Sequence, residues 1–312
     1  MKGLKKIALA TAIAAAPFAA QAGMKALDDT TMGNVTGQAG VTIELETRVS
    51  IGEFTYTDEG TFAVSGIDLG GAVVSGTDSA NAYASATGAG NLLDNLKIDI
   101  DIADDGDAII HVGSLQTGPD GNPVPIDWGM TIDTMELRGN GGEQTTLVSD
   151  MSAWGLLGAL DIRVDTDDVN GVAGTGSLNL DVAFTVEEMN FDVEFMGIGV
   201  NGMSIRGAND GGLTLDDAEL MSLLGNGDDV DQDQRLVALA SGQLGKSFAI
   251  ARLEVYKGDN LNGTKEDVLR ITVDDVLMDI NIQETVIGGA NIGTIGIDNL
   301  HISDTKLAVY GH

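Results

Sequence analysis

The stretch from Leu96 to Ile102, "LKIDIDI", decides the fold class of this chain. Every second residue in it is apolar, and the residues between are Lys or Asp. Successive side chains of a β-strand point to opposite faces of a sheet, so this alternation predicts a strand with one apolar and one polar face. The same period of two recurs in "SLNLDVAF", residues 177–184. We therefore predict a mainly β fold of antiparallel strands that are wet on one side.

A second pattern places apolar residues at relative positions 1, 3, 6 and 8, as in "FTVEEMNF", residues 184–191. The four side chains share one face only if an extra residue is absorbed by a β-bulge or a β-arc corner. The copies are unevenly spaced, which disfavours a regular solenoid. We expect an extended, bulged antiparallel sheet, or an irregular sandwich or roll, with one or two short helices. The six copies begin at Phe62, Met130, Phe184, Ile198, Ile271 and Ile295.

Turn and helix signals interrupt the strands at a few points. Asn140-Gly141 in "LRGNGGEQTTL" predicts a β-hairpin. The clearest helix is "LTLDDAELMSLLGNG", residues 213–227, in which Thr214 suits the N-terminal cap and Gly225 the stop. A weaker candidate helix is "DMSAWGLLGALDI", around Trp154.

Residues 1–22 have the three parts of a secretory signal peptide. Three lysines are followed by an apolar stretch and then by "PFAAQA", which has small residues before a cleavage site after Ala22. We expect the chain to be exported to the periplasm, the outer membrane surface or the cell exterior. Residues 23–40 are expected to form a short helix followed by a Gly-Gln-Ala-Gly linker to the first strand. Residues 41–312 are expected to form a β-rich domain. Prolines cluster near residues 116–127, a candidate sub-boundary.

The mature chain is strongly acidic and contains no cysteine. Cleavage removes three of the 16 basic residues and none of the 48 acidic ones, so the formal net charge becomes −35. Such a surface repels phosphate backbones, which argues against nucleic-acid binding. Two explanations of the acidic composition stay open: adaptation to a saline habitat, or metal binding. No segment after the signal approaches the ~20 apolar residues of a transmembrane helix.

No catalytic constellation is evident in the sequence. His111 and His301 each lie within a strand pattern, and neither has a second histidine at the spacing of a metal chelate. A strand histidine that is either hydrogen-bonded or solvent-facing is the preferred interpretation, since catalysis requires an adjacent nucleophile or an oriented acid. Walker, dinucleotide and Gly-x-Ser-x-Gly motifs do not occur in a credible context. We predict that the protein is not an enzyme.

Calcium is the one cofactor that the sequence leaves open. "NGDDVDQDQ" has aspartates at alternate positions, as oxygen-liganded Ca²⁺ loops do, but Gln234 and Ala240 stand where an EF-hand requires Gly and Glu. The segment "ADDGD" is equally ambiguous. For both segments we prefer the interpretation as an acidic turn over a calcium loop, because Asp and Gly favour turns without any bound ion. The candidate ligands are Asp229, Asp231, Asp233, Asp104 and Asp107.

The opening of the mature chain resembles a family of exported Gram-negative proteins, the FilA-like putative pilus-assembly proteins. That family has a signal peptide followed by Leu-x-Asp, a hydrophobic position, and Val-x-Gly-Gln-Ala-Gly leading into a strand. The resemblance covers about 20 residues and implies a cell-surface or fimbria-associated role with other envelope proteins as partners. It implies no catalytic residues. The matching residues are Leu27, Asp29, Met32, Val35, Gly37, Gln38, Ala39 and Gly40.

Two functions follow as expectations. The first is a non-enzymatic structural or assembly role in a pilus- or fimbria-like system, in which strand edges add a partner. The alternative is a periplasmic or outer-membrane-associated module that binds a lipid or other hydrophobic ligand on the apolar face of its sheet.

Overall fold

The computed structural model describes residues 40–73, 87–118, 121–166, 176–209, 213–224, 230–242 and 246–311. The chain divides into two units, Met1–Ala39 and Gly40–His312, and all described residues belong to the second. The expected signal peptide therefore lies outside the described residues. So do the expected N-terminal helix and almost all of the Gly-Gln-Ala-Gly linker. Residues 116–127 lead from one strand to the next within the second unit. No helix in the described ranges is long and apolar enough to cross a membrane.

The described residues of the second unit form one large antiparallel sheet of long strands with two α-helices, which confirms the predicted fold class. The strands are β1 (Val41–Thr47), β2 (Val49–Thr57), β3 (Thr61–Val73), β4 (Thr87–Asn91), β5 (Leu93–Ile102), β6 (Ala108–Ser114), β7 (Ile126–Arg138), β8 (Gln144–Asp165), β9 (Ser177–Val193), β10 (Ile198–Arg206), β11 (Ala249–Gly258), β12 (Val268–Ile287) and β13 (Ala290–Val309). The helices are the single 3-10 turn η3 (Glu194–Met196), α3 (Asp217–Leu224) and α4 (Val230–Ser241).

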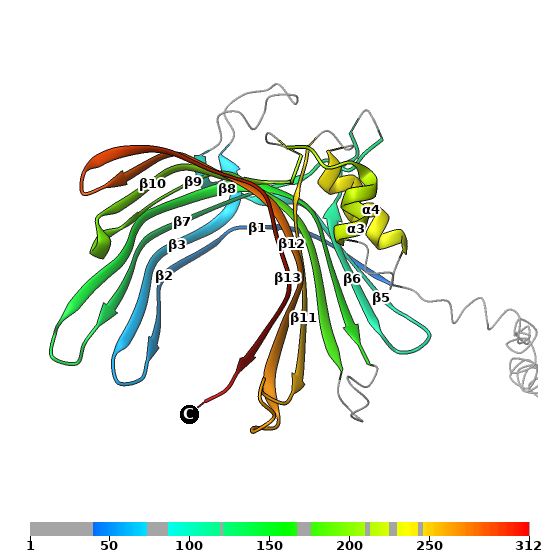
Figure 1. Cartoon of the computed structure of the whole chain (residues 1–312), viewed down its shortest axis with the longest axis horizontal. Helices are drawn as coiled ribbons and strands as arrows, with labels where there is room; N and C mark the ends of the chain where they lie inside the picture. Colours follow the sequence, from blue (N-terminus) through cyan, green and yellow to red (C-terminus); the bar gives the residue numbers. More distant parts are fainter. Residues whose placement is uncertain are drawn as a thin grey trace, which may run out of the picture. The chain divides into compact units, whose positions relative to one another are not determined.

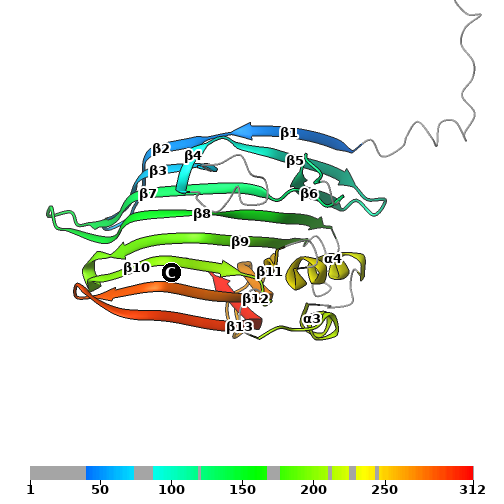
Figure 2. The same cartoon turned by 90° about the horizontal axis from the view of Figure 1, so that it is seen from above.

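Two runs of eight strands share the longest strands of the sheet (Figure 2). One run is β1-β5-β6-β8-β9-β11-β12-β13, and the other is β2-β3-β7-β8-β9-β10-β12-β13. Every neighbouring pair is antiparallel. The predicted hairpin at Asn140-Gly141 is confirmed, because it joins β7 to β8 and is closed by a hydrogen bond from the Gly139 amide to the Glu143 carbonyl oxygen.

The skip in the 1-3-6-8 pattern marks real irregularities of the strands. Gly66, Gly202 and Asn299 occupy the fifth position of three copies, and all three have φ between 50° and 65°. Left-handed backbone favours Gly, Asn and Asp, which explains why these residues stand at the skip. Register shifts accompany the pattern in β9, β10 and β12. The long strands bend along their length, so that the sheet arches and acquires a hollow side (Figure 1).

The two helices cover part of the outer side of this bend (Figure 1). Leu220 and Leu224 of α3 and Leu236 of α4 are almost completely buried, together with Phe248 and the β8 residue Leu156. This is the main hydrophobic cluster of the unit. The apolar side of α3 therefore packs into the core.

The predicted N-terminal cap of α3 is wrong by two residues. Asp216, not Thr214, is the cap, since its Oδ1 accepts hydrogen bonds from the backbone amides of Ala218 and Glu219, each at 2.9 Å. In turn, the Glu219 carboxylate accepts a hydrogen bond from the Asp216 backbone amide at 2.9 Å. This reciprocal pair is a capping box, with the acidic groups at the positive end of the helix.

The weaker helix prediction around Trp154 is also wrong, because this segment lies in the middle of β8. Register shifts occur between Trp154 and Gly155 and between Leu157 and Ala159. Each shift moves apolar side chains out of strict alternation, so the segment imitates the spacing of a helical face.

Candidate functional site

A row of charged side chains crosses the face of the sheet that carries the helices. Cross-strand pairing aligns Asp99, His111, Asp161, Asp181 and Arg252 on five successive strands. Neighbouring side chains on one face of a sheet lie about 5 Å apart, close enough to interact. His111 Nδ1 lies 2.6 Å from Asp161 Oδ1. The strands thus bring together groups that are up to about 150 residues apart in the chain.

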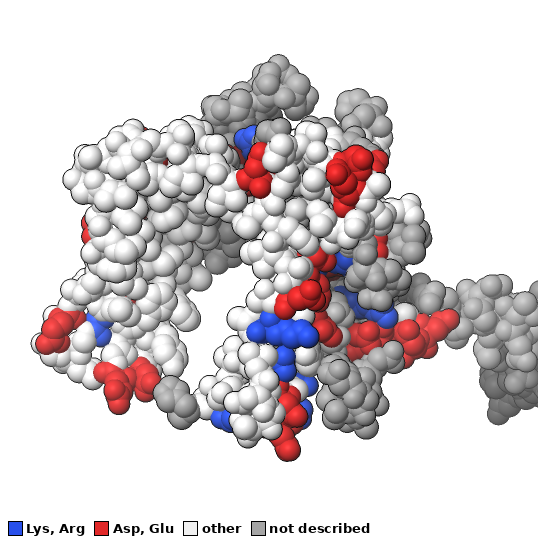
Figure 3. Space-filling view, in the orientation of Figure 1, with Lys and Arg blue, Asp and Glu red and all other residues white. Residues whose placement is uncertain are grey.

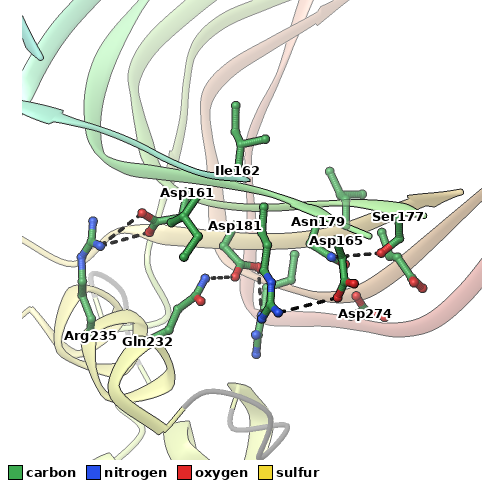
Figure 4. A pocket seen from close by; sticks show the side chains of 14 residues that line it. Asp161, Ile162, Asp165, Ser177, Asn179, Asp181, Gln232, Arg235 and Asp274 are labelled. Atoms are coloured by element: carbon green, nitrogen blue, oxygen red, sulfur yellow. Dashed lines mark hydrogen bonds and ion pairs between the residues drawn. The ribbon is translucent and has the colours of Figure 1, made fainter. Parts of the chain in front are cut away.

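Helix α4 adds polar side chains above this row (Figure 4). Arg235 Nη1 lies 3.1 Å from Asp161 Oδ2, and Gln232 donates a hydrogen bond to Asp181. The helix is therefore held to the sheet by charge-assisted contacts as well as by its apolar residues.

Arg252 is the most deeply buried cation of the row, and its side chain is 7% exposed. Its Nε donates to Asp181 Oδ1 at 3.0 Å, and its Nη1 donates to Asp233 Oδ1 of α4 at 3.1 Å. The same Nη1 donates to the backbone carbonyl of Leu224 at the end of α3. One guanidinium therefore connects the sheet to both helices.

A polar pocket of about 620 Å³ opens beside this cluster. Burial raises the pKa of Asp181 above its ordinary value, although Arg252 acts in the opposite direction. Burial also raises the pKa of Glu254 and of Asp274, and nearby carboxylates add to both shifts. The charged groups that line the pocket are the carboxylates Asp161, Asp165, Asp181, Glu254 and Asp274 and the guanidiniums Arg163, Arg235 and Arg252.

We expect the protein to become more stable when the pH is lowered from about 7 to about 5. Asp181, Glu254 and Asp274 have raised pKa values in the folded state, so the folded protein binds their protons more tightly than the unfolded chain. Their stabilising contribution is complete below the unfolded pKa and is lost as the pH rises through the folded pKa. Carboxylates with lowered pKa values, such as Asp107, lose their contribution only below this window.

The midpoint of urea unfolding at the two pH values measures this effect. The double variant Glu254→Gln/Asp274→Asn should show a smaller rise in midpoint on acidification than the wild type. The control Glu44→Gln/Asp58→Asn changes the net charge equally at exposed positions and should keep the full rise. Equal rises in both variants would show that general charge repulsion, not the pocket, causes the effect.

His111 and His301 each lie within hydrogen-bond distance of a carboxylate. His111 is paired with Asp161, and His301 Nε2 lies 2.9 Å from Asp275 Oδ1. Within the part of the chain that the structure describes, neither imidazole is hydrogen-bonded to a hydroxyl group. Nucleophilic catalysis needs that third contact, which neither His111 nor His301 makes among the described residues.

The first pair of calcium candidates lies in the β5–β6 hairpin. Asp107 is 2% exposed, and its Oδ1 accepts from the Thr166 amide at 2.9 Å and from Thr166 Oγ1 at 3.0 Å. Its Oδ2 accepts from Arg163 Nε at 3.0 Å. The Thr166 amide bond is the main cause of the lowered pKa of Asp107. Asp104 is exposed in the adjoining turn. Asp107 thus binds groups of its own chain with both oxygens.

The second set of calcium candidates lies in and before α4, which begins at Val230. Asp233 is 1% exposed and paired with Arg252, whereas Asp229 and the side chain of Asp231 lie outside what the structure describes. Asp233 therefore lies in a helix and binds a group of its own chain. Within the described ranges, no cluster of three or more His, Asp or Glu residues is arranged to hold a metal ion.

The opposite face of the sheet is apolar and faces the hollow of the bend. Figure 3 shows that the hollow between the two bent halves is lined mostly with uncharged atoms, while charged atoms gather on the right half and at the lower ends of the strands. We call this surface the apolar face and define it by four rows of paired residues. The rows are Ile102-Ala108-Val164-Leu178-Val255-Ile271-Leu307, Val41-Ile100-Ile110-Ile162-Leu180-Leu253-Val273-Thr305, Ile43-Ile98-Val112-Leu160-Val182-Ala251-Val276-Ile302 and Val49-Leu69-Met130-Ala153-Met189-Met203-Ile282-Ile295.

Most side chains of these rows retain solvent exposure. Leu180, Leu253 and Val273 near the middle are half-buried, and Val41 at the end of the same row is 56% exposed. Large continuous apolar surfaces on a protein mark sites that another molecule covers. The apolar face is therefore the stronger candidate for a functional surface, and the charged pocket is a structural cluster that fixes the helices.

Comparison with known proteins adds a partial family match. Residues 1–104 match the model of a family of unknown function, DUF6160. The match covers one third of the 312 residues and ends just after β5. No curated protein and no solved structure matches the chain. The description of the family names no activity, so function must be argued from the two faces of the sheet.

The residues of the charged row were not predicted as a site. Arg252, Asp181 and Asp161 each occur in an alternating strand pattern as the polar member, as in "ALDIRVD" and "ARLEVYK". The alternation indicates their face. The partner of each residue depends on which distant strands pair and in what register, which alternation alone does not give.

Proposed function

We propose that this chain is an exported, non-enzymatic protein of the cell envelope whose apolar face holds a lipid or another elongated hydrophobic ligand. The observation that carries the proposal is the set of continuous apolar rows that line the hollow of the bent sheet (Figure 3). Export is supported by the signal-like residues 1–22. A non-enzymatic role is supported by the partners of His111 and His301 among the described residues, which are carboxylates and, for His111, also Arg235.

The bend sets the direction in which a ligand would lie. The strands bend along their own length, so the hollow runs across them, parallel to the apolar rows (Figure 1). Eight strands spaced by about 4.8 Å give a hollow about 34 Å long. An extended acyl chain can lie along such a hollow and contact one apolar side chain after another. Covering these side chains contributes roughly 25 cal/mol per Å² of apolar surface removed from water.

The variant Leu180→Lys tests this proposal at the middle of a row. Leu180 is half-buried on β9 at the centre of the apolar face, and a lysine there places a charge against the ligand chain. We expect the affinity for a dansyl-labelled fatty acid, measured by fluorescence titration, to fall at least about tenfold, which corresponds to about 1.4 kcal/mol.

The matched control is Asn179→Lys, which adds the same charge one residue away. Asn179 points to the opposite face, where it lines the acidic pocket (Figure 4), so this variant should keep the wild-type affinity. Circular dichroism spectra and unfolding midpoints confirm that both variants are folded. Equal affinity in all three proteins, or failure of the wild type to bind the probe, contradicts the proposal.

A second candidate function is a structural or assembly role at the cell surface, in a pilus- or fimbria-like system. It is supported by the resemblance of the opening residues Leu27 to Gly40 to FilA-like proteins and by sheet edges that have no further partner strand among the described residues. Open edges accept further strands by backbone hydrogen bonding. Immunogold labelling of intact cells tests this role, because an assembly component at the surface is labelled without permeabilisation.

A further inference from the structure

The sheet ends in two long edges. β1 and β2 together form one edge, where β1 pairs with β5 and β2 with β3. β13 forms the other edge and pairs with β12. The edges are similar in length, since they span residues 41–57 and 290–309. Within the described ranges, neither edge has a second partner strand.

Both edges present apolar side chains to solvent. Ordinary edge strands are protected by lysines, prolines or short length. Here neither edge contains proline, and Lys306 is the only lysine. The exposed large apolar residues of the edges are Val41, Ile43, Leu45, Val49, Ile51, Phe54 and Tyr56 on one side and Ile292, Ile295, Ile297, Ile302, Leu307 and Val309 on the other.

The β13 edge is less acidic than the chain as a whole, whereas the β1–β2 edge is about as acidic as the chain. Residues 41–57 carry three carboxylates and one guanidinium, and residues 290–309 carry two carboxylates and one ammonium group. The net negative charge of the chain opposes association, and three net negative charges lie on the two edges that would meet. Edge pairing should therefore strengthen as added salt screens this repulsion.

The directions of the two edges suit each other. Every neighbouring pair in the run from β1 to β13 is antiparallel, and the run contains eight strands, so β13 is antiparallel to β1. A second copy shifted along the sheet without rotation would place its β1–β2 edge beside β13 as one more antiparallel strand. The apolar rows would then continue from one copy into the next.

The spacing of the rows at the two edges agrees with such a junction. The rows begin at Ile43 and Val49 on one edge and end at Ile302 and Ile295 on the other. The first interval is six residues and the second is seven. The extra residue of β13 is accounted for by its irregularity at Asn299, which has φ of 50°. Ile302 of one copy would lie beside Ile43 of the next.

We propose that β13 of one copy pairs with the β1–β2 edge of a second copy, so that copies join head to tail into an open filament with a continuous apolar face. The contact uses different surfaces on the two copies, and without rotation it does not close into a ring. The proposal depends on the edges and does not require that a ligand occupy the apolar face.

Cysteine cross-linking tests the junction directly, because the natural chain contains no cysteine. The single variants Ile43→Cys and Ile302→Cys of the mature chain are prepared separately, mixed at high salt and oxidised. The mixture should give a covalent dimer on non-reducing gels, whereas each variant alone should give none. A chain that carries both cysteines should give a ladder of oligomers, and electron microscopy should show filaments of the wild type.

The control mixture pairs Ile302→Cys with Glu53→Cys, which is on the same edge but far from the proposed register, and should not cross-link. Dimers from Ile302→Cys alone would show a symmetric junction and overturn the head-to-tail arrangement. The absence of cross-links in the mixture, or of any association at high salt, would also overturn it. Probe binding by Leu180→Lys is measured separately, so the two proposals can fail independently.

Discussion

Replacement of Arg252 with methionine is expected to lower the free energy of unfolding by about 3–5 kcal/mol. Arg252 is the buried cation shared by Asp181 and Asp233, and its removal leaves both carboxylates without that partner. The side chain of Asp233 is 2% exposed, so water cannot replace the lost contact. Methionine keeps much of the side-chain length and isolates the effect of the charge.

Equilibrium urea unfolding measures this loss. Lys257→Met is the matched control, because it removes one cation from an exposed position further along the same strand, β11. Lys257 and its partner Asp267 are 61% and 75% exposed. Surface ion pairs contribute about 0–1 kcal/mol, so the control should remain close to the wild type. Adding Asp233→Asn to Arg252→Met should restore part of the stability. An Arg252→Met variant as stable as the control would mean that the charged cluster does not hold the helices.

Gly155→Ala should destabilise the sheet by about 3 kcal/mol or more, at the upper end of the cost of overpacking. A Cβ atom at Gly155 would lie 1.9 Å from the backbone carbonyl oxygen of Thr185 and 2.8 Å from the Trp128 ring. The clash is with backbone of the neighbouring strand β9, so β8 and β9 would have to separate at a register shift. Both strands belong to both runs of the sheet.

Gly52→Ala is the control for this prediction. A Cβ atom at Gly52 has no neighbour within 4 Å, and alanine is favoured over glycine in a strand by roughly 0.5–1 kcal/mol. The control should therefore be slightly more stable than the wild type in the same urea assay. Similar midpoints for the two variants would show that the close approach at Gly155 is not required.

The strands and their irregularities could be predicted because both depend on the spacing of apolar residues within one segment. Alternation at residues 96–102 gave β5, and the skipped positions at Gly66 and Asn299 coincide with left-handed residues. Both signals follow from the geometry of one strand, so no knowledge of its neighbours is needed.

The remaining features depend on contacts between distant segments. Helix α4 was not expected, because Asp231 and Asp233 in its first turn suggested an acidic loop, while Asp233 is in fact buried by Arg252. The partner of Asp233 is 19 residues away, and Asp181 reaches the same arginine across 71 residues. The continuity of the apolar face likewise depends on the register of many strands, which sequence spacing alone leaves open.

Native mass spectrometry of the mature protein, released from its cells without detergent, tests most directly whether the apolar face holds a hydrophobic ligand. We predict a discrete adduct of lipid mass at about one per chain in the wild type and in Asn179→Lys, and its loss in Leu180→Lys. A wild-type protein that carries no adduct and does not take up added fatty acid would contradict the proposed function.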